Sequence, residues 1–126
     1  MDEETAPGQR EVLAEVLHRF LVIEGVIGAL LTRKDGQTIG SAIAGPFNEA
    51  ALAAVTAFVM AESRAVAACL GRRELSMVFA EFTGSILLSF PVGSDAYLVI
   101  IARHPANIVK VQQTFRSISD TLRESA

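Results

Sequence analysis

The side chains able to carry acid–base or nucleophilic chemistry are few and scattered along the chain. There are two histidines, His18 and His104, and one cysteine, Cys69. His18 follows apolar residues at helical spacing, and His104 directly precedes Pro105. Neither histidine has a partner at the spacing of a metal site or a catalytic triad. We therefore expect solvent-facing or capping roles for both histidines, and we expect Cys69 to act as a small buried hydrophobic side chain.

Two carboxylates, Glu62 and Glu81, could form an acid–base pair if a helix around residue 62 packed on a sheet. Two carboxylates alone are weak evidence for catalysis, because charges on helix surfaces and edge strands are common. A salt bridge between Arg64 and Glu62 or Glu81, across an interface between two copies of the chain, is the interpretation that we favour.

The glycines do not form a phosphate-binding loop. Gly25 and Gly28 are followed by neither Lys-Ser nor Lys-Thr, and the third glycine of a dinucleotide-binding loop is missing. We predict no catalytic residue, no cofactor and no metal site, and so a protein that is not an enzyme.

Composition and charge exclude several other classes. The net charge of −3 comes from 14 acidic and 11 basic residues, and three of the acids are residues 2–4, so the rest of the chain is neutral. No basic patch predicts nucleic-acid binding. The apolar stretch near residues 50–61 ends at Glu62 and is too short to span a bilayer, so no membrane insertion is expected. A single cysteine and an acidic N-terminus without signal-peptide order favour the cytoplasm.

The apolar content is high for a small soluble monomer, at 51% with a mean hydropathy of +0.40. A small domain buries a modest fraction of its surface, so we expect part of this apolar area to lie against a partner.

The pattern predicts a disordered tail at 1–8 and a single domain at 9–126. Helical spacing predicts a first helix at 9–22, and the turn signal Asp35-Gly36 predicts a hairpin. Asn48 is an expected N-cap for a long helix that ends before Gly71, and Asn107 is the expected cap of a final helix. The predicted strands are 26–31, 38–44, 75–82, 85–92 and 96–102.

The element order is therefore α-β-β-α-β-β-β-α. The richest apolar runs, 26–31 and 98–102, are predicted to be central strands, whereas 38–44 and 75–82 are predicted to be edges. The fold class is α/β in the broad sense (α+β): a three-layer sandwich around a five-stranded antiparallel sheet. One long helix covers one face and the two terminal helices cover the other.

The long alanine-rich helix at 49–70 carries two apolar stripes. The first consists of Leu52, Val55, Val59, Val66 and Leu70, and the second of Ala54, Phe58, Ala61, Ala65 and Ala68. A helix that is apolar on two sides must be covered on two sides, so one stripe is left for a partner.

In its order of elements and its local patterns, the chain resembles the Roadblock family, which includes the roadblock dynein light chains and MglB-type regulators. The resemblance covers about residues 10–124. It rests on residues 25–31 leading to Asp35-Gly36, on the alanine-rich helix, on 75–82 and 84–87, and on 96–100 followed by Asn107.

The resemblance implies a homodimer joined through the edge strand at 75–82 and the alanine-rich helix. The implied interface residues are Ala54, Phe58, Ala61, Ala65, Ala68, Met77, Phe79 and Glu81. The resemblance also implies a platform for a small Ras-like GTPase. From the residues alone, Arg72 and Arg73 form an exposed basic pair after Gly71, which either complements the dipole of the helix C-terminus or contacts an acidic partner. Arg64 is a further possible partner contact. The sequence leaves open whether the GTPase would be stimulated or only tethered.

A second interpretation is a PAS- or profilin-like sensor of a small ligand. Such domains share an antiparallel sheet flanked by helices, and this interpretation predicts a sizeable internal pocket with a few polar groups. The abundance of small side chains argues against a large pocket lined by aromatic residues.

Overall fold

The computed structural model describes residues 7–71 and 74–125, and its elements follow the predicted order. They are α1 (Pro7–Leu21), β1 (Val26–Arg33), β2 (Thr38–Ile43), α2 (Glu49–Cys69), β3 (Val78–Phe82), β4 (Ser85–Val92), β5 (Ala96–Arg103) and α3 (Ile108–Ser125). The strands form one antiparallel sheet in the order β2-β1-β5-β4-β3. This confirms the predicted fold class.

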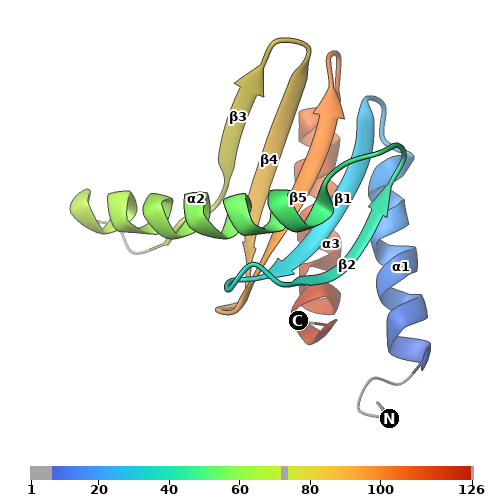
Figure 1. Ribbon diagram of the computed structural model, residues 1–126, viewed down its shortest axis with the longest axis horizontal. Coiled ribbons are helices and arrows are strands. Elements are labelled where there is room, and N and C mark those ends of the chain that lie inside the picture. The colour runs from blue at the N-terminus through green and yellow to red at the C-terminus, as the bar shows by residue number, and fades with distance from the viewer. Residues whose placement is uncertain (1–6, 72–73, 126) are drawn as a thin grey trace.

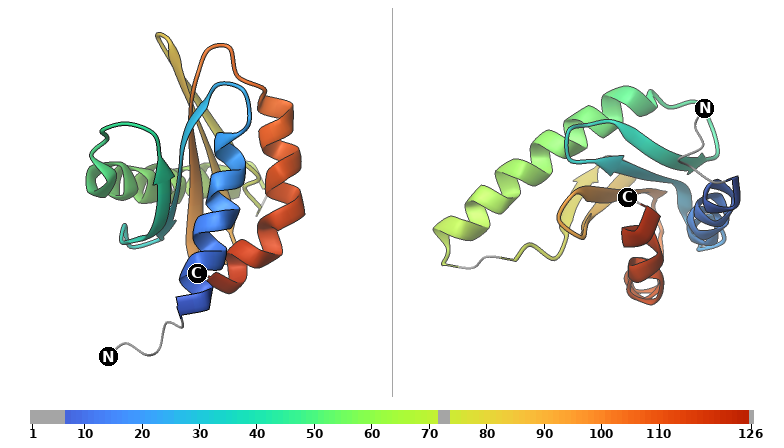
Figure 2. Two further views of the ribbon diagram at one scale, coloured as in Figure 1. Left: turned by 90° about the vertical axis from the view of Figure 1, so that its right-hand side faces the viewer. Right: turned by 90° about the horizontal axis from the view of Figure 1, so that it is seen from below.

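The helices lie on both faces of the sheet, as predicted. α1 and α3 run side by side along one face, and α2 crosses the other face at a steep angle to the strands (Figures 1 and 2). The main core lies between the sheet and the α1–α3 layer, where Phe20, Leu88, Leu98 and Val111 are fully or almost fully buried. A smaller cluster beneath α2 joins Ala53 to Leu30, Val99 and Ile101.

β1 and β5 are the central strands, and they pair with each other along most of their length. Nearly every residue of both strands is buried, because helices cover both faces of the sheet at this point. Continuous apolar runs are typical of strands covered on both faces, and this is why the sequence identified the two strands correctly.

Turns and caps also form where the sequence predicted them. Gly36 has a positive φ of 93°, and the Asp35 carboxylate accepts a hydrogen bond from the Gln37 amide at 3.0 Å. The Asn48 side chain accepts a hydrogen bond from the Ala51 amide at 3.1 Å, and Asn107 does the same for the Lys110 amide at 3.0 Å. Both asparagines satisfy amides at the start of a helix.

The face that α2 turns to the sheet belongs to neither predicted stripe. The buried residues of the helix are Ala53, Thr56, Ala57, Met60 and Ala67. Except for Leu52, which is half-buried, all residues of both predicted stripes are exposed. Small residues are favoured under this helix because they let its backbone approach the sheet closely.

Three other expectations need adjusting. α1 begins at Pro7, two residues earlier than predicted, while residues 1–6 of the expected tail lie outside the described residues. β3 begins at Val78 and not at residue 75, because residues 75–77 do not pair with β4. The expectation that Cys69 is buried is wrong, since this side chain, at the last turn of α2, is exposed.

Candidate interaction surface

The outward face of α2 is a long exposed apolar surface. Val55 is 59% exposed, Phe58 66% and Leu70 71%, and Val59 and Val66 are also exposed. Large apolar side chains scattered singly are normal on a protein surface, but several along one helix mark an interaction site. We call these five residues, together with the exposed alanines Ala54, Ala61, Ala65 and Ala68, the α2 face.

The surface continues at the edge of the sheet. β3 pairs only with β4, so its other side offers unpaired backbone groups. Two of its side chains are exposed phenylalanines, Phe79 at 43% and Phe82 at 54%. Toward its C-terminal end α2 extends past this edge strand (Figures 1 and 2). An apolar edge strand without a cover is a template for pairing with another chain.

The side chains of β3 divide between the two faces of the sheet, as strand alternation requires. Val78 packs with Ala57 and Met60 beneath α2. Met77 is half-buried against the α1–α3 core. Glu81 lies on this second side too, where His104 Nε2 is 3.2 Å from its carboxylate.

The predicted interface residues are therefore brought together only in part. Ala54, Phe58, Ala61, Ala65 and Ala68 are all exposed on α2. Met77, Phe79 and Glu81 point away from α2, and the β3 residues that share its side of the sheet are Val78, Ala80 and Phe82. Strict counting by two along the strand could have separated these two sets.

The basic residues named from the sequence have different surroundings. The Arg64 guanidinium lies 5.3 Å from the centroid of the Tyr97 ring, within range of a cation–π contact. The Glu81 carboxylate lies near His104 of the same chain, and its contact with Arg64 of a second copy stays a prediction. Arg72 and Arg73 lie outside the described residues.

Side chains with possible chemistry remain dispersed. Within residues 7–71 and 74–125, no group of three His, Cys, Asp or Glu side chains is arranged to hold a metal ion. His18 is exposed, and its Nδ1 is 2.9 Å from the Ala14 carbonyl oxygen one turn earlier. His104 is partly exposed at the end of β5. Both histidines are exposed to solvent, as expected.

By length and composition alone, α2 could also cross a membrane, with a mean hydropathy of 1.5 over an 18-residue window. The helix continues through Glu62 and Arg64. It is therefore longer than the apolar stretch at 50–61, which alone is too short to span a bilayer. In the fold it packs on the sheet through Ala53, Ala57 and Met60. The absence of membrane insertion stays a prediction.

Comparison with known proteins gives one family and several similar structures. The family model described as Roadblock/LC7 domain matches residues 12–102. The structure of the gliding protein MglB from Thermus thermophilus is 25% identical in sequence with a TM-score of 0.87, and the match covers 97% of this chain and 93% of that one. No curated protein sequence matches the chain.

Two further structures have the same fold. A structure described as MglB with tetrameric arrangement is 24% identical with a TM-score of 0.88, covering 97% of this chain and 93% of that one. A Roadblock/LC7 domain from Streptomyces avermitilis is 16% identical with a TM-score of 0.81, covering 88% of this chain and 94% of that one.

Proposed function

The chain belongs to the Roadblock/LC7 family, and we propose that it works as a homodimeric, non-enzymatic platform that binds a small Ras-like GTPase. The proposal concerns a protein of the cytoplasm that acts by contact with its partners. We expect no catalytic turnover from the chain alone.

The observation that carries the proposal is the continuity of the α2 face with the open edge at β3. Phe58 on the helix and Leu70 at its C-cap expose about two thirds or more of their surface, and Phe82 is exposed on the side of β3 that α2 shares. Pairing of two β3 strands would extend the sheet across both copies, and the two α2 helices would then cover each other's apolar side. Removal of this apolar area from water would favour such a dimer, against the entropic cost of bringing two chains together.

The comparisons support self-association as a property of similar proteins. One matched structure is described as MglB with a tetrameric arrangement, and the match covers 97% of the present chain. Binding to a small GTPase rests on the family resemblance, because Roadblock proteins often serve Ras-like GTPases as platforms.

The dimer is tested by the molar mass in solution, measured by light scattering after size-exclusion chromatography at micromolar concentration. One chain has a mass of 13.4 kDa. A mass near twice this value is expected. A monomer across the whole concentration range would overturn the homodimer.

The GTPase is tested by capture from a native lysate on the immobilised protein, with either GDP or a non-hydrolysable GTP analogue present. Mass spectrometry is expected to identify a Ras-like GTPase that is retained more strongly in one nucleotide state. Failure to recover such a GTPase in both states would contradict this part of the proposal.

The sensor of a small ligand is the alternative that shares this architecture. It would be favoured by a ligand-dependent rise in melting temperature across a panel of metabolites, because a ligand that binds only the folded state stabilises it. The platform proposal expects no such rise.

A further inference from the structure

A gap in the sheet lies at the end of β4 that is far from the β3–β4 turn. The pairing of β3 with β4 ends at Val78 and Ser89, whereas the pairing of β4 with β5 continues to Val92 and Ala96. Residues 90–92 therefore have a strand partner on one side only. Residues 74–77 run beside this gap without joining the sheet, and α3 forms the opposite wall.

The gap opens into a groove with two adjoining parts. The first has a volume of about 360 Å³ and an apolar floor that includes Met77, Phe90 and Phe115. The second has a volume of about 500 Å³ and reaches round the end of the sheet from Arg64 to Arg123. Leu75, Ser76 and Pro91 line both parts, so the two parts lie next to each other.

Contacts inside the groove join α3 to β4 and to the segment that precedes β3. The Phe90 and Phe115 rings are stacked, with centroids 4.4 Å apart and planes 18° apart. The Gln112 amide donates a hydrogen bond to the Met77 sulfur at 3.7 Å, which ties α3 to the segment that precedes β3. A site that is already formed loses little conformational entropy when a partner binds.

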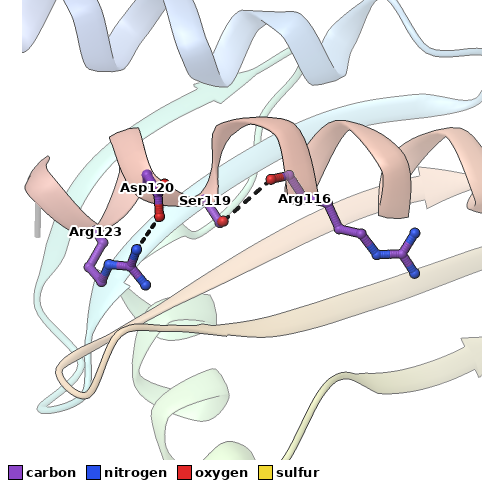
Figure 3. A network of polar contacts seen from close by, with 4 residues as sticks. All are labelled: Arg116, Ser119, Asp120 and Arg123. Carbon is purple, nitrogen blue, oxygen red and sulfur yellow. Dashed lines mark hydrogen bonds and ion pairs between the residues drawn. The ribbon is translucent and has the colours of Figure 1, made fainter.

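The rim of the groove is basic, although the body of the chain is neutral. Arg64, Arg116 and Arg123 line it, against a single carboxylate from Glu74. Arg123 is bound to Asp120 one turn earlier on α3, while the Arg116 guanidinium extends away from the helix and from these two residues (Figure 3). No ion pair of Arg116 occurs among residues 7–71 and 74–125.

From the gap, the apolar floor and the basic rim, we propose that this groove binds an extended acidic segment of a partner protein. Apolar side chains of the segment would lie on the Phe90–Phe115 floor, and its carboxylates would meet Arg116 and Arg123. An extended chain fits this place because alternate side chains of such a chain can enter the groove, although Pro91 has no N–H to donate to a backbone partner. Charge complementarity selects an acidic segment over a basic one.

The proposed groove adjoins the surface assigned to the dimer and shares Met77 with the predicted interface residues, but most of its floor lies elsewhere. Its floor lies on the α3 side of the sheet, and Arg116 is an exposed residue of α3, whereas the dimer is assigned to the outward side of α2 and the outer side of β3. A variant of Arg116 therefore leaves the molar mass in solution unchanged. Failure of one proposal can be distinguished from failure of the other.

The test uses the full chain and two pools of fluorescent peptides, about ten residues long. In one pool Asp or Glu alternates with Leu, Ile, Val or Phe, and in the matched pool Lys or Arg replaces the acids. Fluorescence anisotropy measures binding, and amide shifts in NMR spectra locate it. We expect the acidic pool to bind and to shift the amides of Ser76, Gln112 and Arg116, and the basic pool to leave them unchanged.

Arg116→Glu is expected to weaken binding of the acidic pool by about tenfold or more, the size of effect that loss of a charge pair produces. Arg19→Glu is the matched control, since Arg19 is an exposed arginine on α1 outside the groove, and it is expected to bind as the wild type does. Three results would overturn the proposal: equal binding of both pools, equal loss in both variants, or shifts confined to α2 and β3. The first of these includes the case in which neither pool binds.

Discussion

The two edge strands of the sheet, β2 and β3, differ in how much of them the rest of the chain covers. At β2, Gly40 lies so close beneath α1 that an added Cβ would come within 2.7 Å of the Leu13 side chain. The Ser41 hydroxyl also donates a hydrogen bond to the Glu49 carboxylate at 2.9 Å, which ties this edge to the first turn of α2. At β3 the described structure has no comparable cover, and phenylalanines are exposed there.

This difference fits the role that the proposed dimer gives to each edge. Edge strands that are left bare and apolar recruit other chains, so proteins cover or charge those that must stay unpaired. α1 and the start of α2 pack on the faces of β2, although its outer edge pairs with no strand among the described residues. β3 is left available, beside the part of α2 that extends past the sheet (Figure 1).

The largest expected effect comes from a charge placed at the open side. Phe58→Asp puts a carboxylate into the centre of the proposed interface, where loss of an aromatic anchor costs about 2 kcal/mol or more. We expect the dimer to weaken by about 30-fold or more, so that a dilution series followed by light scattering gives the mass of one chain.

Val22→Asp provides the control for this variant. Val22 is 86% exposed in the turn between α1 and β1, far along the chain from α2 and β3. It should leave the molar mass unchanged. If Phe58→Asp and Val22→Asp weakened the dimer equally, the cause would be a loss of overall stability and not a change in the α2 face.

A smaller effect is expected from lysines placed on the two edges. Phe82→Lys adds a charge to the apolar edge and should weaken self-association by about tenfold, because a lysine on an edge strand opposes pairing with another chain. Thr38→Lys, at an exposed position of β2, should have no effect on the dimer. Sedimentation equilibrium of both variants compares the edges directly, and an equal loss in both would remove the distinction between them.

The smallest effect concerns the tie at the closed edge. Ser41→Ala removes the hydrogen bond to Glu49 and should lower the free energy of unfolding by about 1 kcal/mol. Urea unfolding is best measured in the Phe58→Asp background, where dissociation does not contribute. Ser63→Ala is the matched control, since that hydroxyl bonds only the Val59 carbonyl within its own helix, and it should change stability by less than about 0.5 kcal/mol. If Ser63→Ala lost as much free energy of unfolding as Ser41→Ala, the hydrogen bond from Ser41 to Glu49 would have no particular role in stability.

Much of the fold could be predicted because single residues and short runs have strong local structural preferences. Asn48 and Asn107 each precede an apolar helical pattern, and both cap a helix as expected. The continuous apolar runs of β1 and β5 identified the centre of the sheet, because only strands covered on both faces dispense with polar residues.

The orientation of α2 could not be predicted in the same way. Periodicity depends on contrast between apolar and polar residues, and this helix has little contrast around most of its circumference. The buried face instead combines the small Ala53 and Ala57 with the large, fully buried Met60. The larger valines and Phe58, which dominate a hydropathy pattern, point outward.

The groove beside β4 could not be predicted either. Leu75 and Met77 fit a strand pattern together with Phe79, and nothing local signals that the chain joins the sheet only at Val78. The segment before the strand instead contacts α3, as in the hydrogen bond from Gln112 to Met77, which lies 35 residues away in the chain.

The pairing of the two central strands also determines when the molecule can become complete during synthesis. β1 pairs Val26 with Ala102 and Arg33 with Ala96, so the first strand waits for the last one. Contacts between such distant parts of a chain slow folding, because a long loop must close before they form. Until β5 leaves the ribosome, the first hairpin and the apolar α2 have no finished sheet to pack on, and this is the period in which the nascent chain is most exposed to aggregation and to chaperones.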